Sequence, residues 1–340
     1  MAQRSFTSDN AAGVHPEVLR AIVAANVGHA LAYGSDEWTH RATKKLQALL
    51  GDCDVFFVSN GTGANVLGLS ALVKPFEAVI CAQTAHVQMD ECGAFERFTG
   101  ARLLTVPTSD GKLRAQALEP LLAGRGNQHA SQPRVVSITN ATELGTVYKP
   151  SEVRELATWC HERGLYLHCD GARIANAAAA NGGDIRAVLQ GVDVLSFGGT
   201  KNGLLGGEAV LFFDKPLARD FLFVRKQGMQ LSSKMRFVAA QFDALLTDGL
   251  WLDSARHANR MAQMLANEAA AAGVRLARPT EANEVFALLP RDVISRVQAE
   301  WPFYVWNEQT SEVRWVCSWD TTEDDVRGLV GSLARCLKEL

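Results

Sequence analysis

The pattern of apolar and polar positions divides the chain into an alternating region and a more helical region. From Val55 onward, apolar runs of strand length alternate with helical or loop stretches such as residues 151–163. These runs predict seven strands, at residues 55–58, 78–81, 103–106, 135–139, 166–169, 192–197 and 209–213. Such alternation, with strands that are apolar throughout, predicts an α/β fold with a mostly parallel sheet covered on both faces.

The pattern before the first strand predicts two helices. Residues 1–14 are polar and irregular, and a helix is expected from Pro16. Its buried stripe is predicted to comprise Val18, Leu19, Ile22 and Val23. A second helix is expected at residues 37–50, ending at Gly51, a residue type that often follows a helix.

The pattern changes again after about residue 231. Two long helices are predicted at residues 233–246 and 251–272, followed by short strands at 284–289, 303–306 and 313–318 and by a helix at 322–337. Helices mixed with short strands are typical of a small α+β unit. We therefore expect a large domain over residues 1–249 and a small C-terminal α+β domain over residues 250–340.

Composition describes a globular protein without an obvious macromolecular partner. The chain has 340 residues, 47% of them apolar, and a formal net charge of −3, so neither nucleic acid nor a membrane surface is an expected partner. No apolar run approaches the ~18 residues that a membrane span needs, and the start lacks a signal-peptide core. Seven scattered cysteines without a C-x-x-C pair predict a reduced, cytoplasmic protein.

One lysine is the first candidate for chemistry. Lys201 follows the apolar run 192–197 and the pair Gly198-Gly199. A lysine on a small-residue loop after a buried strand lies where open α/β sheets bind ligands. Poor hydration there favours a neutral, nucleophilic amine, which suits a Schiff base with a carbonyl. Taken alone, a single lysine at this position favours the alternative of a surface turn lysine.

Two upstream stretches favour a specific cofactor. The turn Gly61-Thr62-Gly63 joins a strand to an apolar helix, and helix N-termini bind phosphate well. Asp170 follows the strand 166–169, although an aspartate there could simply cap a helix. A phosphate cup, a carboxylate for a pyridine nitrogen and a Schiff-base lysine are what pyridoxal 5'-phosphate (PLP) requires.

A histidine adds to this set. His86 follows the strand 78–81, where its imidazole could stack on a planar cofactor or transfer protons. A capping or surface histidine is the alternative. The spacing of His86, Asp90 and Glu91 matches no metal-binding motif, so no metal site is expected.

Several motifs together resemble one known family. They are Ser8-Asp9, Ala32-Tyr33-Gly34, Asn60-Gly61-Thr62, Thr84-Ala85-His86, Asp170-Gly171-Ala172-Arg173-Ile174 and Gly199-Thr200-Lys201-Asn202. This set, spread over nearly the whole chain, resembles the low-specificity L-threonine aldolases, which are PLP enzymes of the aminotransferase fold (fold type I). The resemblance implies that fold and that cofactor.

The resemblance also implies roles for individual residues. Lys201 would hold PLP, Asp170 would pair with the ring nitrogen, and His86 would stack on the ring. Further cofactor contacts are implied for Asn60, Gly61, Thr62, Arg173 and Lys226. Substrate contacts are implied for Ser8, Asp90, His129, Arg173 and Arg314.

The implied reaction is retro-aldol cleavage of L-threonine, L-allo-threonine and related β-hydroxy-α-amino acids to glycine and an aldehyde. Either His86 or His129 could act as the base, and the sequence does not choose between them. The chain departs from other branches in the segment Thr139-Asn140-Ala141-Thr142-Glu143, where those branches carry a histidine, so the pocket that faces Thr142 and Glu143 stays open. The preferred aldehyde and the threo or erythro preference also stay open.

The resemblance further implies a homo-oligomer, expected to be a tetramer of two tight dimers. A basic residue from a neighbouring subunit would then complete the phosphate site. Arg225, Lys226 and Lys234 are the candidates, and Lys226 is preferred.

Three other functions stay open at this point. Another fold type I PLP enzyme, a β-eliminating lyase or an aminotransferase, would release an α-keto acid instead of glycine. A catalytically silent binding homologue is disfavoured by the intact Lys201 and Asp170. A nucleotide-binding Rossmann enzyme is disfavoured because Gly61-Thr62-Gly63 lacks the dinucleotide fingerprint.

Overall fold

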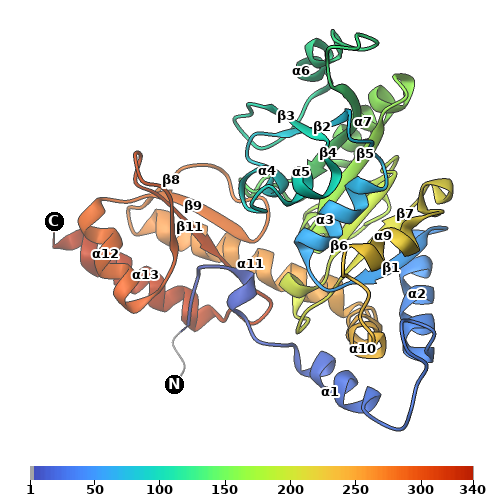
Figure 1. Cartoon of the computed structure of the whole chain (residues 1–340). Coiled ribbons are helices and arrows are strands. Elements are labelled where there is room, and N and C mark those ends of the chain that lie inside the picture. Colours follow the sequence, from blue (N-terminus) through green and yellow to red (C-terminus); the bar gives the residue numbers. More distant parts are fainter. Residues whose placement is uncertain (1–3, 340) are drawn as a thin grey trace.

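The computed structural model describes residues 4–339 and arranges them around two sheets (Figure 1). The larger sheet has seven strands in the order β1-β7-β6-β5-β4-β2-β3. Their bounds are β1 Asp54–Val58, β2 Glu77–Ala82, β3 Arg102–Val106, β4 Gln132–Thr139, β5 Tyr166–Gly171, β6 Val194–Gly198 and β7 Glu208–Phe212. Only β7 runs against its neighbours, so the predicted seven-stranded, mostly parallel sheet is confirmed.

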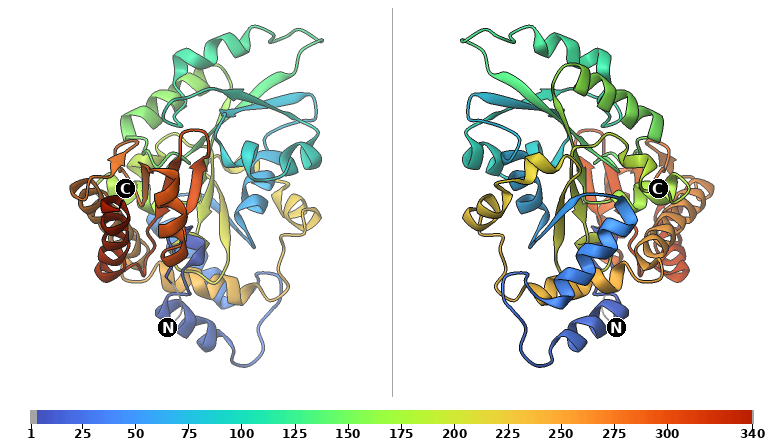
Figure 2. Two further views of the ribbon diagram at one scale, coloured as in Figure 1. Left: turned by 90° about the vertical axis from the view of Figure 1, so that its left-hand side faces the viewer. Right: turned by 90° about the vertical axis from the view of Figure 1, so that its right-hand side faces the viewer.

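Helices cover both faces of this sheet (Figure 2). The α-helices are α1 Pro16–Ala25, α2 Glu37–Leu50, α3 Gly61–Ser70, α4 His86–Met89, α5 Ala94–Thr99, α6 Ala115–Leu118, α7 Pro150–Glu162, α8 Ile174–Ala180, α9 Phe221–Gln227, α10 Met235–Leu245, α11 Leu250–Ala271, α12 Arg291–Glu300 and α13 Glu323–Lys338. Short 3-10 turns are η1 Asp9–Ala11, η2 Glu119–Leu122, η3 Ala187–Leu189, η4 Thr200–Asn202 and η5 Lys215–Ala218. Because both faces are covered, every residue of β6 and β7 is buried, which explains why these strands read as continuous apolar runs.

The smaller sheet is antiparallel and has the order β10-β11-β9-β8. Its strands are β8 Arg275–Leu276, β9 Glu284–Leu288, β10 Tyr304–Asn307 and β11 Glu312–Val316. The N-terminal segment belongs to this unit, because the Phe6 side chain is buried in its core and the Phe6 backbone bonds to Pro302 and Val316. A segment far away in the sequence therefore completes the small unit.

One long helix joins the two hydrophobic cores. The first turns of α11 bury Trp251 and Ala255 in the core of the large sheet. Later turns bury Met261 and Leu265 in the core of the small sheet. The predicted domain boundary after residue 249 falls at the start of this helix.

The structure corrects the predicted buried stripe of the first helix. Val18 is buried, but Leu19 and Val23 are 52% and 66% exposed. The reason is that α1 packs on α10 along a narrow strip and otherwise projects from the body of the molecule (Figure 1). An apolar pattern predicts which side of a helix is apolar, but it does not show whether another part of the same chain covers that side.

Two elements of the small unit escaped prediction. Helix α12 has a stripe of only three buried apolar residues, Val293, Ile294 and Val297, which is too short to stand out. Strand β8 has two residues and depends on its pairing with β9. Among the described residues, no helix is both long and apolar enough to cross a membrane.

Candidate active site

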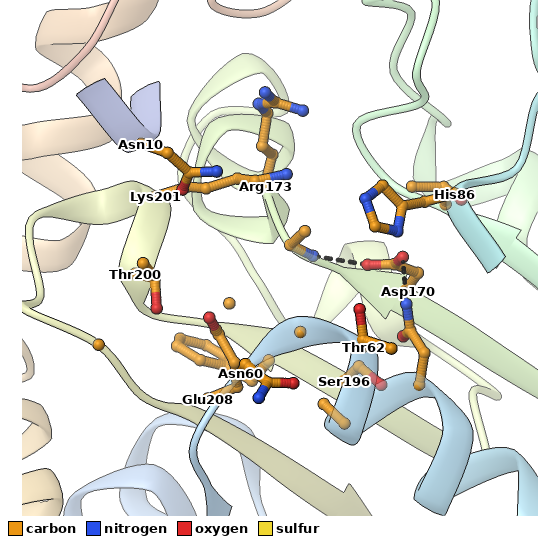
Figure 3. A pocket seen from close by; sticks show the side chains of 18 of the residues that line it. Asn10, Asn60, Thr62, His86, Asp170, Arg173, Ser196, Thr200, Lys201 and Glu208 are labelled. Atoms are coloured by element: carbon orange, nitrogen blue, oxygen red, sulfur yellow. Dashed lines mark hydrogen bonds between the residues drawn. The ribbon is translucent and has the colours of Figure 1, made fainter. Parts of the chain in front are cut away.

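A cavity of about 470 Å³ opens at the carboxyl edge of the large sheet (Figure 3). Six of the seven strands run in one direction, so the segments that follow them meet at this edge. Seven of the residues implicated by the sequence line the cavity: Asn60, Gly61, Thr62, His86, Asp170, Arg173 and Lys201.

Lys201 reaches the cavity from η4, immediately after β6. A side chain at Gly198 would clash there, because its Cβ would lie 2.3 Å from the carbonyl oxygen of Ala172. This glycine therefore allows β6 to pass close to the end of β5 before the chain turns into η4. The amine of Lys201 has no hydrogen-bond partner among the described residues, and it is available to a ligand.

Asp170 lies at the end of β5 and is buried. Its Oδ1 accepts the N–H of Ala172 at 2.9 Å, and its Oδ2 accepts an N–H of Asn65 at 2.7 Å. Two donors from different elements thus fix the orientation of this carboxyl group. In Figure 3 it lies between His86 and the start of α3.

The N-terminus of α3 forms a second side of the cavity. Asn60 caps the helix, because its Oδ1 accepts the N–H of Gly63 at 2.7 Å. The N–H groups of Gly61 and Thr62 have no acceptor within the helix, as is usual for a first helical turn. They and the helix dipole make a site that suits an anion such as phosphate.

A buried carboxyl group stands beside this anion site. Glu208 pairs with Val58, the last residue of the strand that precedes Asn60. Its Oε2 accepts the N–H of Gly199 at 2.6 Å, which holds the loop that carries Lys201. Burial raises the pKa of Glu208 to about 7.

His86 begins α4 and faces Asp170 across the cavity (Figure 3). Its ring Nδ1 lies 2.9 Å from Oε1 of Glu91, and this hydrogen bond raises the pKa of His86. The backbone N–H of His86 donates to Glu143 at 2.9 Å. Two acidic residues therefore hold this histidine at the rim of the cavity.

The residues implied to bind a substrate carboxylate are drawn together by the N-terminal segment. Arg173 is buried and donates through Nε and Nη2 to Asp9, at 2.7 and 3.0 Å. Ser8 donates to the same carboxylate at 3.3 Å. Arg173 and Arg314 also lie 3.6 and 3.4 Å from Oε1 of the buried Glu284. Arg173, just after β5 of the large sheet, and Arg314, on β11 of the small sheet, thus place their guanidinium groups near the same carboxylate, that of Glu284.

Five other implicated residues do not line the cavity within one chain: Ser8 and Arg314, described above, and Asp90, Lys226 and His129. Asp90 is exposed at the end of α4, and Lys226 is exposed on α9 with its amine 5.3 Å from the ring centroid of Tyr33. His129 is exposed in the turn that precedes β4. Since the cavity lies beyond the other end of this eight-residue strand, His129 is about 26 Å away along the strand direction.

Five buried polar residues of the site were not assigned a role from the sequence: Asn65, Glu91, Glu143, Ser196 and Glu208. Asn65 had a signal, because it is a lone amide in an otherwise apolar and buried helix. Glu91 also bonds to Asn65, 26 positions away, and Glu143 to His86, 57 positions away, so sequence spacing could not reveal these contacts.

Glu143 combines burial with an unmatched oxygen. Its Oε1 accepts from the backbone N–H of His86 and, at 2.8 Å, from the hydroxyl of Thr139. Its Oε2 is buried without a partner among the described residues. Burial and the nearby charge of Asp170 raise the pKa of Glu143 to about 7.

Comparison with known proteins gives consistent results for sequence and structure. The family model described as Beta-eliminating lyase matches residues 5–291. A low-specificity L-threonine aldolase of Pseudomonas aeruginosa is 47% identical over 332 residues, which cover 96% of each chain. The structure of a threonine aldolase from Leishmania major superposes with a TM-score of 0.93 at 33% identity, covering 98% of this chain and 99% of that one.

A more distant match bears on the fold alone. A serine palmitoyltransferase from Sphingomonas wittichii superposes with a TM-score of 0.74 at 15% identity, covering 99% of this chain and 87% of that one. The predicted PLP-dependent transferase fold (fold type I) is confirmed by these structural neighbours.

The raised pKa of Glu143 makes a prediction about stability. A carboxyl whose pKa is 4.5 in the unfolded chain and about 7 when folded binds its proton more tightly in the folded state. Its ionisation therefore destabilises the fold as the pH rises from about 5 to 8, by up to about 3 kcal/mol. Glu143→Gln, which cannot ionise, should gain stability relative to the wild type as the pH rises over this range.

Denaturant unfolding at pH 5 and pH 8 measures this effect. Glu162→Gln is a matched control, because Glu162 is exposed on α7. The same stability difference between Glu143→Gln and wild type at both pH values would show that Glu143 does not hold a proton in the folded protein.

Proposed function

Since the chain belongs to the β-eliminating lyase family, we propose that it cleaves L-threonine, L-allo-threonine and related β-hydroxy-α-amino acids to glycine and an aldehyde. The cofactor is PLP, and the enzyme is an aldehyde-lyase of low specificity. One observation carries the proposal: a lysine amine with no partner among the described residues, a buried carboxylate and a helix N-terminus meet in one cavity. The relative from Pseudomonas aeruginosa bears the name of this activity.

The residues that line the cavity fit PLP in their chemistry. Lys201 offers an amine without a competing partner, and Asp170 offers a carboxylate held by two donors. The N–H groups of Gly61 and Thr62 suit a phosphate, and the imidazole of His86 suits the face of an aromatic ring. When bound, PLP supplies an electron sink for the bond that breaks at the substrate α-carbon.

The protein's own residues would orient the substrate. Arg173 and Arg314 lie near one another at Glu284, and both can receive the α-carboxylate of an amino acid. With the carboxylate and the amine both held, the bond between the α- and β-carbons has a defined direction. The β-substituent then has the least constrained position, and one methylene changes affinity by only about 1–3 kcal/mol. Low specificity follows from this arrangement.

The β-hydroxyl must lose its proton for an aldehyde to leave. A base must be within hydrogen-bond reach of that hydroxyl. His86 lines the cavity of its own chain. His129 and Asp90 are exposed and outside the cavity, so His129 could serve the reaction only in the cavity of another copy.

We propose a homo-oligomer, a tetramer of two tight dimers. Apolar side chains lie exposed on α1, on the loop that follows it, on α9 and beside the cavity: Leu19, Val23, Val27, Leu31, Leu205, Leu222, Phe223 and Met229. Exposed apolar groups in such numbers are typical of surfaces that another protein covers. Lys226 lies on α9 among them, and it would complete the phosphate site of a second copy.

The location proposed for the enzyme is the cytoplasm. All seven cysteines are unpaired, and six of them are buried. Unpaired cysteines are typical of reducing compartments.

β-Elimination by a similar enzyme is the second candidate. It is favoured by the name of the family model alone. It would release ammonia and an α-keto acid in place of glycine.

The reaction is tested by incubating the PLP-loaded enzyme with L-threonine. Glycine and acetaldehyde should appear in equal amounts, and Lys201→Ala should lower the rate at least a thousandfold while keeping the fold, because it removes the nucleophile. Ammonia with 2-oxobutanoate and no glycine would contradict the aldolase and leave a PLP enzyme. Near-normal activity of Lys201→Ala would contradict the site itself.

The assembly is tested by light scattering of an active preparation. The expected mass is four times 36.9 kDa. Val27→Asp, which puts a charge on the exposed apolar surface, should shift the mass downward, whereas Glu162→Gln on α7 should not. A wild-type mass of 36.9 kDa in an active sample would refute the oligomer.

A further inference from the structure

A continuous hydrogen-bonded chain links His86 to Asp170 beneath the cavity. Oε1 of Glu91 lies 2.9 Å from Nδ1 of His86, and it accepts an N–H of Asn65 at 2.9 Å. The same amide nitrogen of Asn65 donates to Oδ2 of Asp170 at 2.7 Å. The side chain of Glu91 is completely buried, and Asn65 is 3% exposed.

The chemistry of each atom in this chain is restricted. The amide nitrogen of Asn65 carries two protons, so it can donate to one carboxylate on each side. The other oxygens of Glu91 and Asn65 are buried without partners among the described residues. Glu91 is therefore held through Oε1 alone, by His86 on one side and Asn65 on the other.

We propose that Glu91 is a positioning residue for His86: it accepts the Nδ1–H of the imidazole and leaves the lone pair of Nε2 to the cavity, while Asn65 couples this pair to Asp170. This proposal rests on the function proposed above in one respect: it assumes that the reaction takes place in this cavity. It adds Glu91 and Asn65 to the site, as residues that act by positioning His86 and Asp170.

The direction of the proton follows from the contacts of Oε1. This oxygen already receives an N–H from Asn65, so it acts as an acceptor in that bond. A proton of its own would have to share the oxygen with the Asn65 donor and point at Nδ1. Burial raises the pKa of Glu91, and the hydrogen bonds from His86 and Asn65 oppose that rise. An Oε1 without a proton accepts from both neighbours at once, which leaves the ring proton on Nδ1.

The charges around His86 affect how readily its ring takes up a second proton, at Nε2. Glu91 and Asp170 attract a positive ring, and both raise the pKa of His86, whereas Lys201 opposes it. Glu143 contacts only its backbone N–H. A proton that arrives at Nε2 therefore forms an imidazolium that Glu91 stabilises, and a carboxylate behind a histidine commonly has this effect.

Nitrogen-15 NMR of the histidine-labelled, PLP-loaded enzyme tests the proposal without turnover. The wild type should show Nδ1 protonated and Nε2 unprotonated in neutral His86, assigned by its loss in His86→Asn. Glu91→Gln keeps an oxygen acceptor but removes the charge. The tautomer should persist, and the titration midpoint of His86 should move to lower pH.

Two comparisons make the result specific. His161, whose Nε2 lies 3.0 Å from Asp193 on another part of the chain, should give the same nitrogen signals in wild type and Glu91→Gln. The acid limb of the kcat profile of Glu91→Gln should move with His86. Glu91→Leu should lose the fixed tautomer.

Two results would overturn the proposal. One is a wild-type His86 with the proton on Nε2 and a bare Nδ1, which would make Glu91 the donor. The other is an unchanged titration of His86 in Glu91→Gln. Neither depends on which product forms from threonine, so failure here is distinct from failure of the aldolase assignment.

Discussion

The buried ion pair between Arg173 and Asp9 is the contact on which the two halves of the molecule depend. Arg173 lies just after strand β5 of the large sheet. Asp9 belongs to the N-terminal segment, which completes the small unit, and the two side chains form an ion pair. Asp9 also accepts from Asn283, just before β9. Breaking such a buried pair from one side commonly costs about 3–5 kcal/mol, because an unpaired charge stays behind.

The same contact determines the electrostatics of the proposed substrate end of the cavity. Arg173 and Arg314 bring two positive charges, and Asp9 and Glu284 bring two negative ones. Both oxygens of Glu284 are buried without a hydrogen bond among the described residues. The arginines are therefore oriented by carboxylates that do not satisfy them fully, which leaves capacity for a further carboxylate.

The sequence predicted those parts of the site that follow directly from the sheet. Lys201, Asp170 and His86 each come soon after a buried apolar run, and the parallel arrangement brings such positions to one edge. Contacts between distant segments could not be predicted in this way. Asp9 and Arg173 are 164 residues apart, and the link through Asn65 and Glu91 depends on how α3 and α4 pack. The exposed side of α1 was also mistaken for core, since its apolar pattern is the same in either case.

Chemical trapping of the cofactor tests most directly whether Lys201 binds PLP in this cavity. Borohydride reduction of the purified enzyme, followed by peptide mass analysis, fixes the cofactor to the amine that holds it. We expect loss of the near-visible absorption and a phosphopyridoxyl group on the peptide that contains Lys201. A label on another lysine, or no label on an enzyme that cleaves threonine, would show that Lys201 does not bind the cofactor.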